Sequence, residues 1–210
     1  MRRGEGTRGK VPVVELWRTH ARAVVAVFFA LTGHNALNYI LAVFSLSFMT
    51  SPEVGMSRGC ALLAVSIGSV CGVLTTRLGG LAADRFGSRA VLATSSLLGA
   101  VGAFALFWAL SSGGDLVLAS VAIAVGYGLV IACTSGSQGA FLADLFPTAE
   151  RFSGIALLRE TNGAIVAGFS PLIAAALISA ADGSTWGAAL FLAAYCLSSV
   201  LAVLLMRSRQ

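Results

Sequence analysis

The chain has 210 residues, of which 57% are hydrophobic and 11% are charged, and its formal net charge is +5. An average soluble domain carries roughly 25% charged residues, so this composition excludes a soluble globular protein as the main interpretation. The basic residues gather near the ends of apolar segments, which favours a role in membrane orientation over the binding of nucleic acid.

A basic leader and six apolar segments make up the chain, and each segment is long enough to cross a bilayer as a helix. The segments cover residues 23–49, 60–78, 90–111, 116–143, 152–180 and 186–206. The sequence therefore predicts an all-α membrane protein. Its predicted parts are a cytoplasmic basic leader at 1–22, a six-helix transmembrane domain at 23–206 and a cytoplasmic tail at 207–210.

Positive charge is distributed unevenly between the two sides of the predicted domain. The leader, the stretches at 79–89 and 144–151, the tail and the helix ends next to them hold every Arg and Lys except Arg58. This bias is the positive-inside signal. It predicts a multi-pass protein of the cytoplasmic (plasma) membrane with both termini in the cytoplasm.

The first segment carries polar residues at membrane depth, in the string G-H-N-A-L-N-Y at 33–39. His34 lies roughly 15 Å along the helix from its cytoplasmic end, and Asn38 shares its face because the two are four residues apart. One interpretation is a neutral histidine that bonds to a neighbouring helix. The other is a contact with a proton or a substrate, since imidazole titrates near physiological pH.

Two charged residues lie inside the fifth segment, Arg159 and Glu160, roughly 12 Å past its cytoplasmic end. Adjacent residues on a helix point about 100° apart, so the two do not pair simply with each other. Arg159 can extend back toward the cytoplasm along its aliphatic stem. The preferred interpretation is a water-filled cavity in which Arg159 meets an anionic substrate or a carboxylate and Glu160 carries a cation or a proton.

The fourth segment has a polar face among small residues. This face is formed by Tyr127, Thr134, Ser135, Ser137 and Gln138. It suits close packing against another helix or the lining of a polar cavity, and the sequence leaves both open.

No metal or cofactor site is expected, because the four cysteines lie singly in apolar segments without a C-x-x-C pair. An enzyme is also disfavoured. An intramembrane serine protease would need a serine close to a histidine base, usually in a G-x-S-G turn, and this string does not occur in the chain.

Two strings resemble known motifs. G-L-A-A-D-R-F-G-S-R-A-V-L at 80–92 resembles the cytoplasmic signature loop of the major facilitator superfamily. Q-G-A-F-L-A-D-L-F-P-T-A-E-R-F-S-G-I-A-L at 138–157 is similar to the segment between the tenth and eleventh helices of its metabolite:proton symporter branch. The spacing of the strings resembles that of the C-terminal half of a twelve-helix transporter, from about Val13 onward.

The resemblance implies that the six helices form one half of a facilitator-type bundle, with a transport path and a conformational latch. The expected path residues are His34, Asn38, Gln138, Arg159 and Glu160. The expected latch residues are Gly80, Asp84, Arg85, Gly87, Arg89, Asp144 and Arg151. In the family the aspartate at the position of Asp84 meets a helix end and nearby arginines when the cytoplasmic side is closed.

Three departures from the family pattern involve four residues. His34 stands where the branch often has glutamate, and Ser88 stands where the signature loop usually has arginine. Arg159 and Glu160 replace a usual Tyr-Gln pair, which suggests a different substrate or a lost one.

The expected function is transport of a small polar metabolite, an organic acid or a zwitterion, by alternating access with proton coupling. The expected partners are the lipid bilayer, the substrate, the proton, and either an N-terminal six-helix half or a second copy, because the substrate site of such transporters lies between two halves. The alternative is a non-transporting, truncated membrane fragment or an assembly partner.

Overall fold

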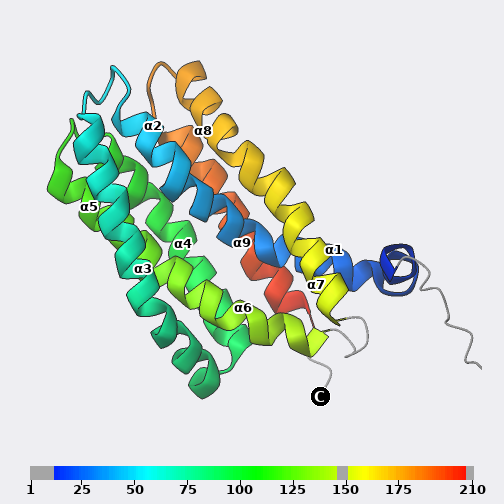
Figure 1. Ribbon diagram of the computed structural model, residues 1–210. Coiled ribbons are helices and arrows are strands. Elements are labelled where there is room, and N and C mark those ends of the chain that lie inside the picture. Colours follow the sequence, from blue (N-terminus) through cyan, green and yellow to red (C-terminus); the bar gives the residue numbers. More distant parts are fainter. Residues whose placement is uncertain (1–11, 146–150, 207–210) are drawn as a thin grey trace, which may run out of the picture.

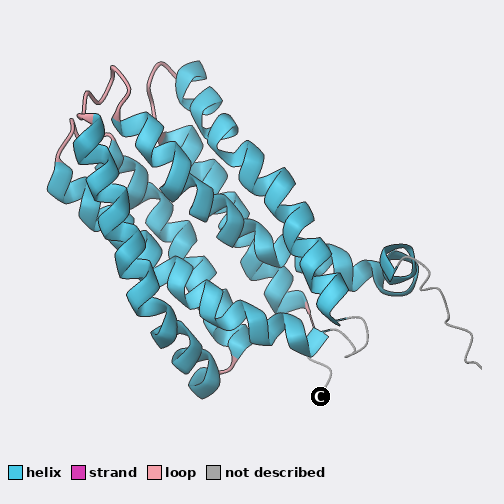
Figure 2. Cartoon of the chain, viewed as in Figure 1, coloured by secondary structure: helices cyan, strands magenta, loops and turns pink. Residues whose placement is uncertain are grey.

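The computed structural model describes residues 12–145 and 151–206, with the side chains of 24–143 and 155–206. Every regular element in these residues is a helix, and short loops join them (Figure 2). Six stretches of the described chain are long and apolar enough to cross a membrane: Val24–Met49, Arg58–Phe86, Ser88–Leu110, Leu116–Ala143, Ile155–Ala180 and Trp186–Leu205. The predicted all-α fold with six spans is confirmed.

Three of the spans contain a π-helical segment, labelled η, within the helix. The first span consists of α1 (Pro12–Tyr39), η1 (Ile40–Phe44) and α2 (Ser45–Met49). The second and third are α3 (Arg58–Phe86) and α4 (Ser88–Leu110). The fourth consists of α5 (Leu116–Val125), η2 (Gly126–Ile131) and α6 (Ala132–Leu145). The fifth consists of α7 (Arg151–Asn162), η3 (Gly163–Ala167) and α8 (Gly168–Ala180), and the sixth is α9 (Trp186–Leu205).

The helices form a bundle with their loops at two opposite ends (Figure 1). The helix α9 packs against both α1 and α4, α3 packs against α5 and α6, and α7 packs against α1. The loops at 50–57, 111–115 and 181–185 share one end, while the turn at Gly87 and the end of α9 share the other. This arrangement agrees with the predicted alternation of the connections across a membrane.

The helix ends have local causes in the sequence. The Asp115 carboxylate accepts hydrogen bonds from the Val117 and Leu118 amides at 2.9 and 3.2 Å, and so caps the start of α5. Gly87 adopts a φ of +86°, a conformation that side chains disfavour, and there the chain turns from α3 into α4.

The expected loop at 79–89 is wrong for most of its length, because α3 continues to Phe86. Inside a bilayer a helix satisfies its own backbone polar groups, which favours continuation until the chain leaves the apolar region. Asp84 and Arg85 lie in the exposed last turn of α3. They therefore belong to a helix end that precedes a tight turn.

Glycine backbones meet where α3 crosses α6. A Cβ added at Gly79 would lie 2.4 Å from the Ala132 carbonyl oxygen, and a Cβ added at Gly136 would lie 2.5 Å from the Gly80 nitrogen. Only glycine fits such contacts without a shift of the helices, which is how small residues bring membrane helices together. This crossing fixes the position of α6 against α3.

The Ser199 hydroxyl of α9 bonds to the backbone of α1. It accepts from the Gly33 amide at 2.8 Å and donates to the Phe29 carbonyl at 2.8 Å, the two groups that pair with each other in an α-helix. A Cβ at Gly33 would lie 2.8 Å from the Cys196 Cα, so α1 and α9 are also in close contact here. The contact lies one residue before His34.

Candidate functional site

The first polar contact of the candidate site joins α1 to α6. His34 Nδ1 lies 2.6 Å from Thr134 Oγ1, within hydrogen-bond distance. Thr134 is 1% exposed, whereas the His34 side chain is half-buried. One side of the imidazole is therefore held by α6.

An amide network joins α1 to α7 in the same region. Asn35 Nδ2 donates to Asn162 Oδ1 at 2.6 Å, and Asn162 Nδ2 donates to the Phe28 carbonyl at 2.8 Å and to Thr32 Oγ1 at 3.2 Å. Asn162 is fully buried. Because a buried amide without partners is costly in an apolar interior, this network fixes how α7 is rotated against α1.

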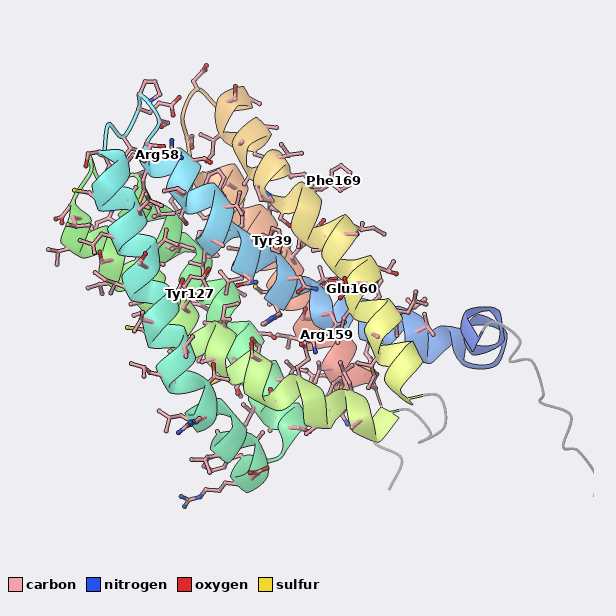
Figure 3. The ribbon with its side chains drawn as sticks, in the orientation of Figure 1. Tyr39, Arg58, Tyr127, Arg159, Glu160 and Phe169 are labelled. Carbon is pink, nitrogen blue, oxygen red and sulfur yellow. The ribbon has the colours of Figure 1, made fainter. Side chains whose placement is uncertain are left out.

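Arg159 lies three residues before Asn162 on α7, so the amide network also sets the direction in which this face of α7 points. Both Arg159 and Glu160 are exposed on the surface of the chain, and Figure 3 shows them on α7 next to α1. Arg159 is close enough to His34 to act on it electrostatically. The result is a cation on α7 within electrostatic reach of an imidazole on α1.

The other two predicted path residues lie close to this region in sequence. Gln138 is buried on α6, one helical turn beyond Thr134, and Asn38 is half-buried on α1, one turn beyond His34. The structure thus brings His34 together with Arg159 and with Thr134 of the predicted polar face. Glu160 is exposed beside them.

The polar face predicted for the fourth segment is divided between two environments. Tyr127 packs on α3, where a Cβ at Gly72 would lie 3.1 Å from the Tyr127 Cβ. Thr134 instead meets His34 on α1, and Ser135 is exposed. Ser137 is buried and donates to the Cys133 carbonyl of its own helix at 2.8 Å. Both alternatives, packing and lining of a polar site, therefore apply to parts of this segment.

The predicted latch residues lie at the end of the bundle where α3, α4 and α9 meet. The Arg85 guanidinium stacks over the Phe86 ring, 5.4 Å from its centroid. Arg89 donates a hydrogen bond to the Leu204 carbonyl near the C-terminal end of α9, where a cation is electrostatically favoured. Asp84 is exposed nearby.

Some of the predicted latch lies outside the described residues, namely the side chains of Asp144 and Arg151. Gly80 contributes its backbone to the crossing of α3 with α6, and Gly87 provides the turn between α3 and α4. Across the described residues, no group of three or more His, Cys, Asp or Glu side chains could hold a metal ion.

Sequence reasoning missed the amide pair of Asn35 and Asn162. Both residues lie in polar strings in which other residues were predicted to be functional. Asn35 follows His34, and Asn162 lies three residues after Arg159. An asparagine within a membrane span seldom faces lipid, and that rule could have identified them. Their pairing across α1 and α7 follows only from the packing of the helices.

Comparison with known proteins identifies two similar transport proteins, both from Escherichia coli (strain K12). The chain is 30% identical to the shikimate transporter over 207 residues. The aligned region covers 96% of this chain and 45% of that protein. It is 28% identical to the inner membrane metabolite transport protein YhjE over 169 residues, and this aligned region covers 79% of this chain and 38% of that protein. The chain thus spans about half the length of the curated relatives it matches or less. No family model matches it.

Proposed function

The chain belongs to the major facilitator superfamily and corresponds to one half of its transporters, and from this premise we propose that it takes part in the transmembrane transport of a small polar metabolite. The observation that carries the proposal is the polar cluster of His34, Asn35, Asn162 and Arg159 on membrane-spanning helices. Such groups are costly in hydrocarbon, and they are typical of substrate and ion pathways.

Arg159 supports an anionic or zwitterionic substrate. Its guanidinium is exposed on the chain, so a second molecule can reach it. A planar guanidinium binds a carboxylate with two parallel charge-assisted hydrogen bonds. We therefore propose an organic acid or a zwitterion whose carboxylate meets Arg159.

Proton coupling is the finer part of the proposal. A histidine such as His34 titrates near physiological pH when unperturbed. Glu160, which directly follows Arg159 in the sequence, is a second titratable group of the site. A proton that binds here changes the charge of the site in which the substrate carboxylate would bind. Uptake would then depend on the pH difference across the membrane.

A second six-helix half completes the proposed transport unit. In such transporters the substrate binds between two halves that rock against each other. The exposure of Arg159 and Glu160 supports this proposal, because charged groups in a span must face protein or water. The second half would be a separate N-terminal half or a second copy of this chain.

The residues at the end of α3 would act as the latch that holds the cytoplasmic side of the transporter closed. Asp84 and Arg85 are exposed, and Arg89 is half-buried against α9, so the first two remain accessible to a partner half. A charge-assisted pair at this end can break and form again as the halves move.

Uptake into proteoliposomes tests the proposal. Vesicles contain the chain alone or together with the N-terminal half of the E. coli shikimate transporter, and radiolabelled shikimate and a labelled zwitterion are the probes under an imposed pH gradient. We expect uptake only with both halves. Arg159→Ala should raise KM about 10-fold to 100-fold, because a hydrogen bond to a charged group contributes about 1.5–3 kcal/mol.

Arg58→Ala is the matched control, because Arg58 lies at the opposite end of the bundle from Arg159 (Figure 3). It should leave uptake unchanged, and Arg159→Lys should keep part of it. Equal uptake by the Arg159→Ala variant and the wild type would refute the assigned role. A lack of uptake in every combination would favour the alternative, a non-transporting fragment or an assembly partner.

A further inference from the structure

The hydrogen bonds of Thr134 have a defined direction. Its Oγ1 lies 2.9 Å from the Val130 carbonyl oxygen and 3.0 Å from the Ile131 carbonyl oxygen. A hydroxyl has one hydrogen and a carbonyl oxygen can only accept, so the Thr134 hydrogen points toward these two carbonyls. The lone pairs of Oγ1 are then the groups that face His34 Nδ1 at 2.6 Å.

From this direction we infer that Thr134 is a positioning residue that keeps the proton of neutral His34 on Nδ1, and that Nε2 is the atom at which the site takes up a proton. A neutral imidazole carries one N–H, and the bond to Thr134 requires it at Nδ1. The opposite direction would make Thr134 donate to the ring and give up both carbonyl contacts. Since Thr134 is buried, no solvent is at hand to replace them.

The inference rests on the proposed transport function and adds a mechanism to it. In the neutral ring Nε2 is a bare acceptor and repels a substrate carboxylate. After protonation the ring donates from Nε2 and keeps its Nδ1 bond to Thr134, so the site gains a donor in addition to Arg159. Proton binding and anion binding thereby favour each other at one atom, without a change in how the ring is held.

Few other groups near His34 could bind the proton in its place. Within the described residues, Arg159 of α7 is the charged group that acts on the ring, and Glu160, the next residue of α7, is exposed. On α6, Thr134 and Gln138 do not titrate in the physiological range, and Cys133 is half-buried. From α9, the Cys196 thiol lies 4.0 Å from the Gly33 carbonyl rather than against the ring.

Nitrogen NMR of the histidine ring tests the assignment directly. The chain has two histidines, so His20→Gln leaves His34 as the single ring when the chain is labelled with ¹⁵N-histidine and placed in lipid bilayers. At a pH where the ring is neutral, we expect a protonated Nδ1 and an unprotonated Nε2. A wild-type ring protonated at Nε2 would overturn the inference.

Variants of Thr134 separate a positioning role from a structural one. Thr134→Val has a similar shape without the hydroxyl and should populate both tautomers, whereas Thr134→Ser should restore the wild-type spectrum. Far-UV circular dichroism checks that each variant is folded. An unchanged spectrum in Thr134→Val would also overturn the inference, and the wild-type spectrum decides even if this variant does not fold.

Two replacements of His34 extend the test to uptake. His34→Asn places an amide nitrogen near the position of Nδ1, and His34→Gln places one near that of Nε2. We expect the Asn variant to stay as stable as the wild type in an SDS titration and to lose the pH dependence of uptake. An unchanged pH profile in both His34→Asn and Thr134→Val, with active transport, would refute the inference and leave the proposed function intact. Absence of uptake together with the expected NMR spectrum would refute the function and support the tautomer.

Discussion

The crossing of α3 with α6 allows a quantitative prediction for Gly136→Ala. The added Cβ would lie 2.5 Å from the Gly80 nitrogen and 2.7 Å from the Gly79 carbonyl carbon. Both are backbone atoms and cannot turn aside like the end of a side chain. The helices must therefore separate by about 1 Å before the contact becomes an ordinary one, which begins at 3.4 Å.

The matched control is Gly139→Ala, one turn further along α6. Its Cβ would meet no atom within 4 Å. Both substitutions gain about 1 kcal/mol of helix propensity, so this gain cancels in the comparison. Overpacking costs about 1–3 kcal/mol, and we expect the free energies of unfolding of the two variants to differ by that amount, with Gly136→Ala the less stable.

The assay is an SDS titration of the chain in detergent micelles, followed by tryptophan fluorescence and far-UV circular dichroism. Wild type and both variants are measured at the same protein and detergent concentrations. Equal free energies of unfolding for Gly136→Ala and Gly139→Ala would refute the reasoning. That result would mean that the glycine backbones are not in contact at this crossing.

Two further predictions use the same titration. Asn162→Leu removes the amide that bonds to Asn35 and to the Phe28 carbonyl, so the free energy of unfolding should fall by about 1–3 kcal/mol; an unaltered value would show that the network does not hold α7. Ser199→Ala removes the hydroxyl that bridges α1, and because such bonds in membranes contribute about 0.6 kcal/mol each and at most about 1.7, we expect a loss of about 1–2 kcal/mol. Ser198→Ala, which loses only a bond within α9, is the control, and an effect equal to that of Ser199→Ala would contradict the bridge.

Hydrophobic length predicted the spans well, because a bilayer imposes one length scale on every helix. The end of the second span is the exception. The polar residues after Gly79 indicated a loop, yet Gly79 lies against Ala132 in a helix crossing and α3 continues for more than another turn to Phe86. Polarity in a sequence shows where the chain meets water, and it does not show whether the helix ends there.

The sequence pointed to individual residues of the candidate site, but not to the contacts between them. Depth along a helix identified His34 and Arg159, because charged and titratable groups stand out in an apolar span. Their partners, Thr134 for the ring and the Asn35–Asn162 pair for the rotation of α7, depend on how three helices are turned against one another. The relative rotation of these helices cannot be deduced from residue spacing or composition.

The π-helical segment η2 changes how sequences of this family should be aligned. Tyr127 and Thr134 are seven residues apart and would share a face of an uninterrupted α-helix, yet Tyr127 contacts α3 while Thr134 contacts α1. The extra residue in the turn at Gly126–Ile131 rotates everything after it by about 100° relative to everything before it. A relative that lacks one residue there would keep a continuous helix and present a different residue to α1. An alignment that moves this gap into the nearest loop would therefore equate residues that occupy different faces.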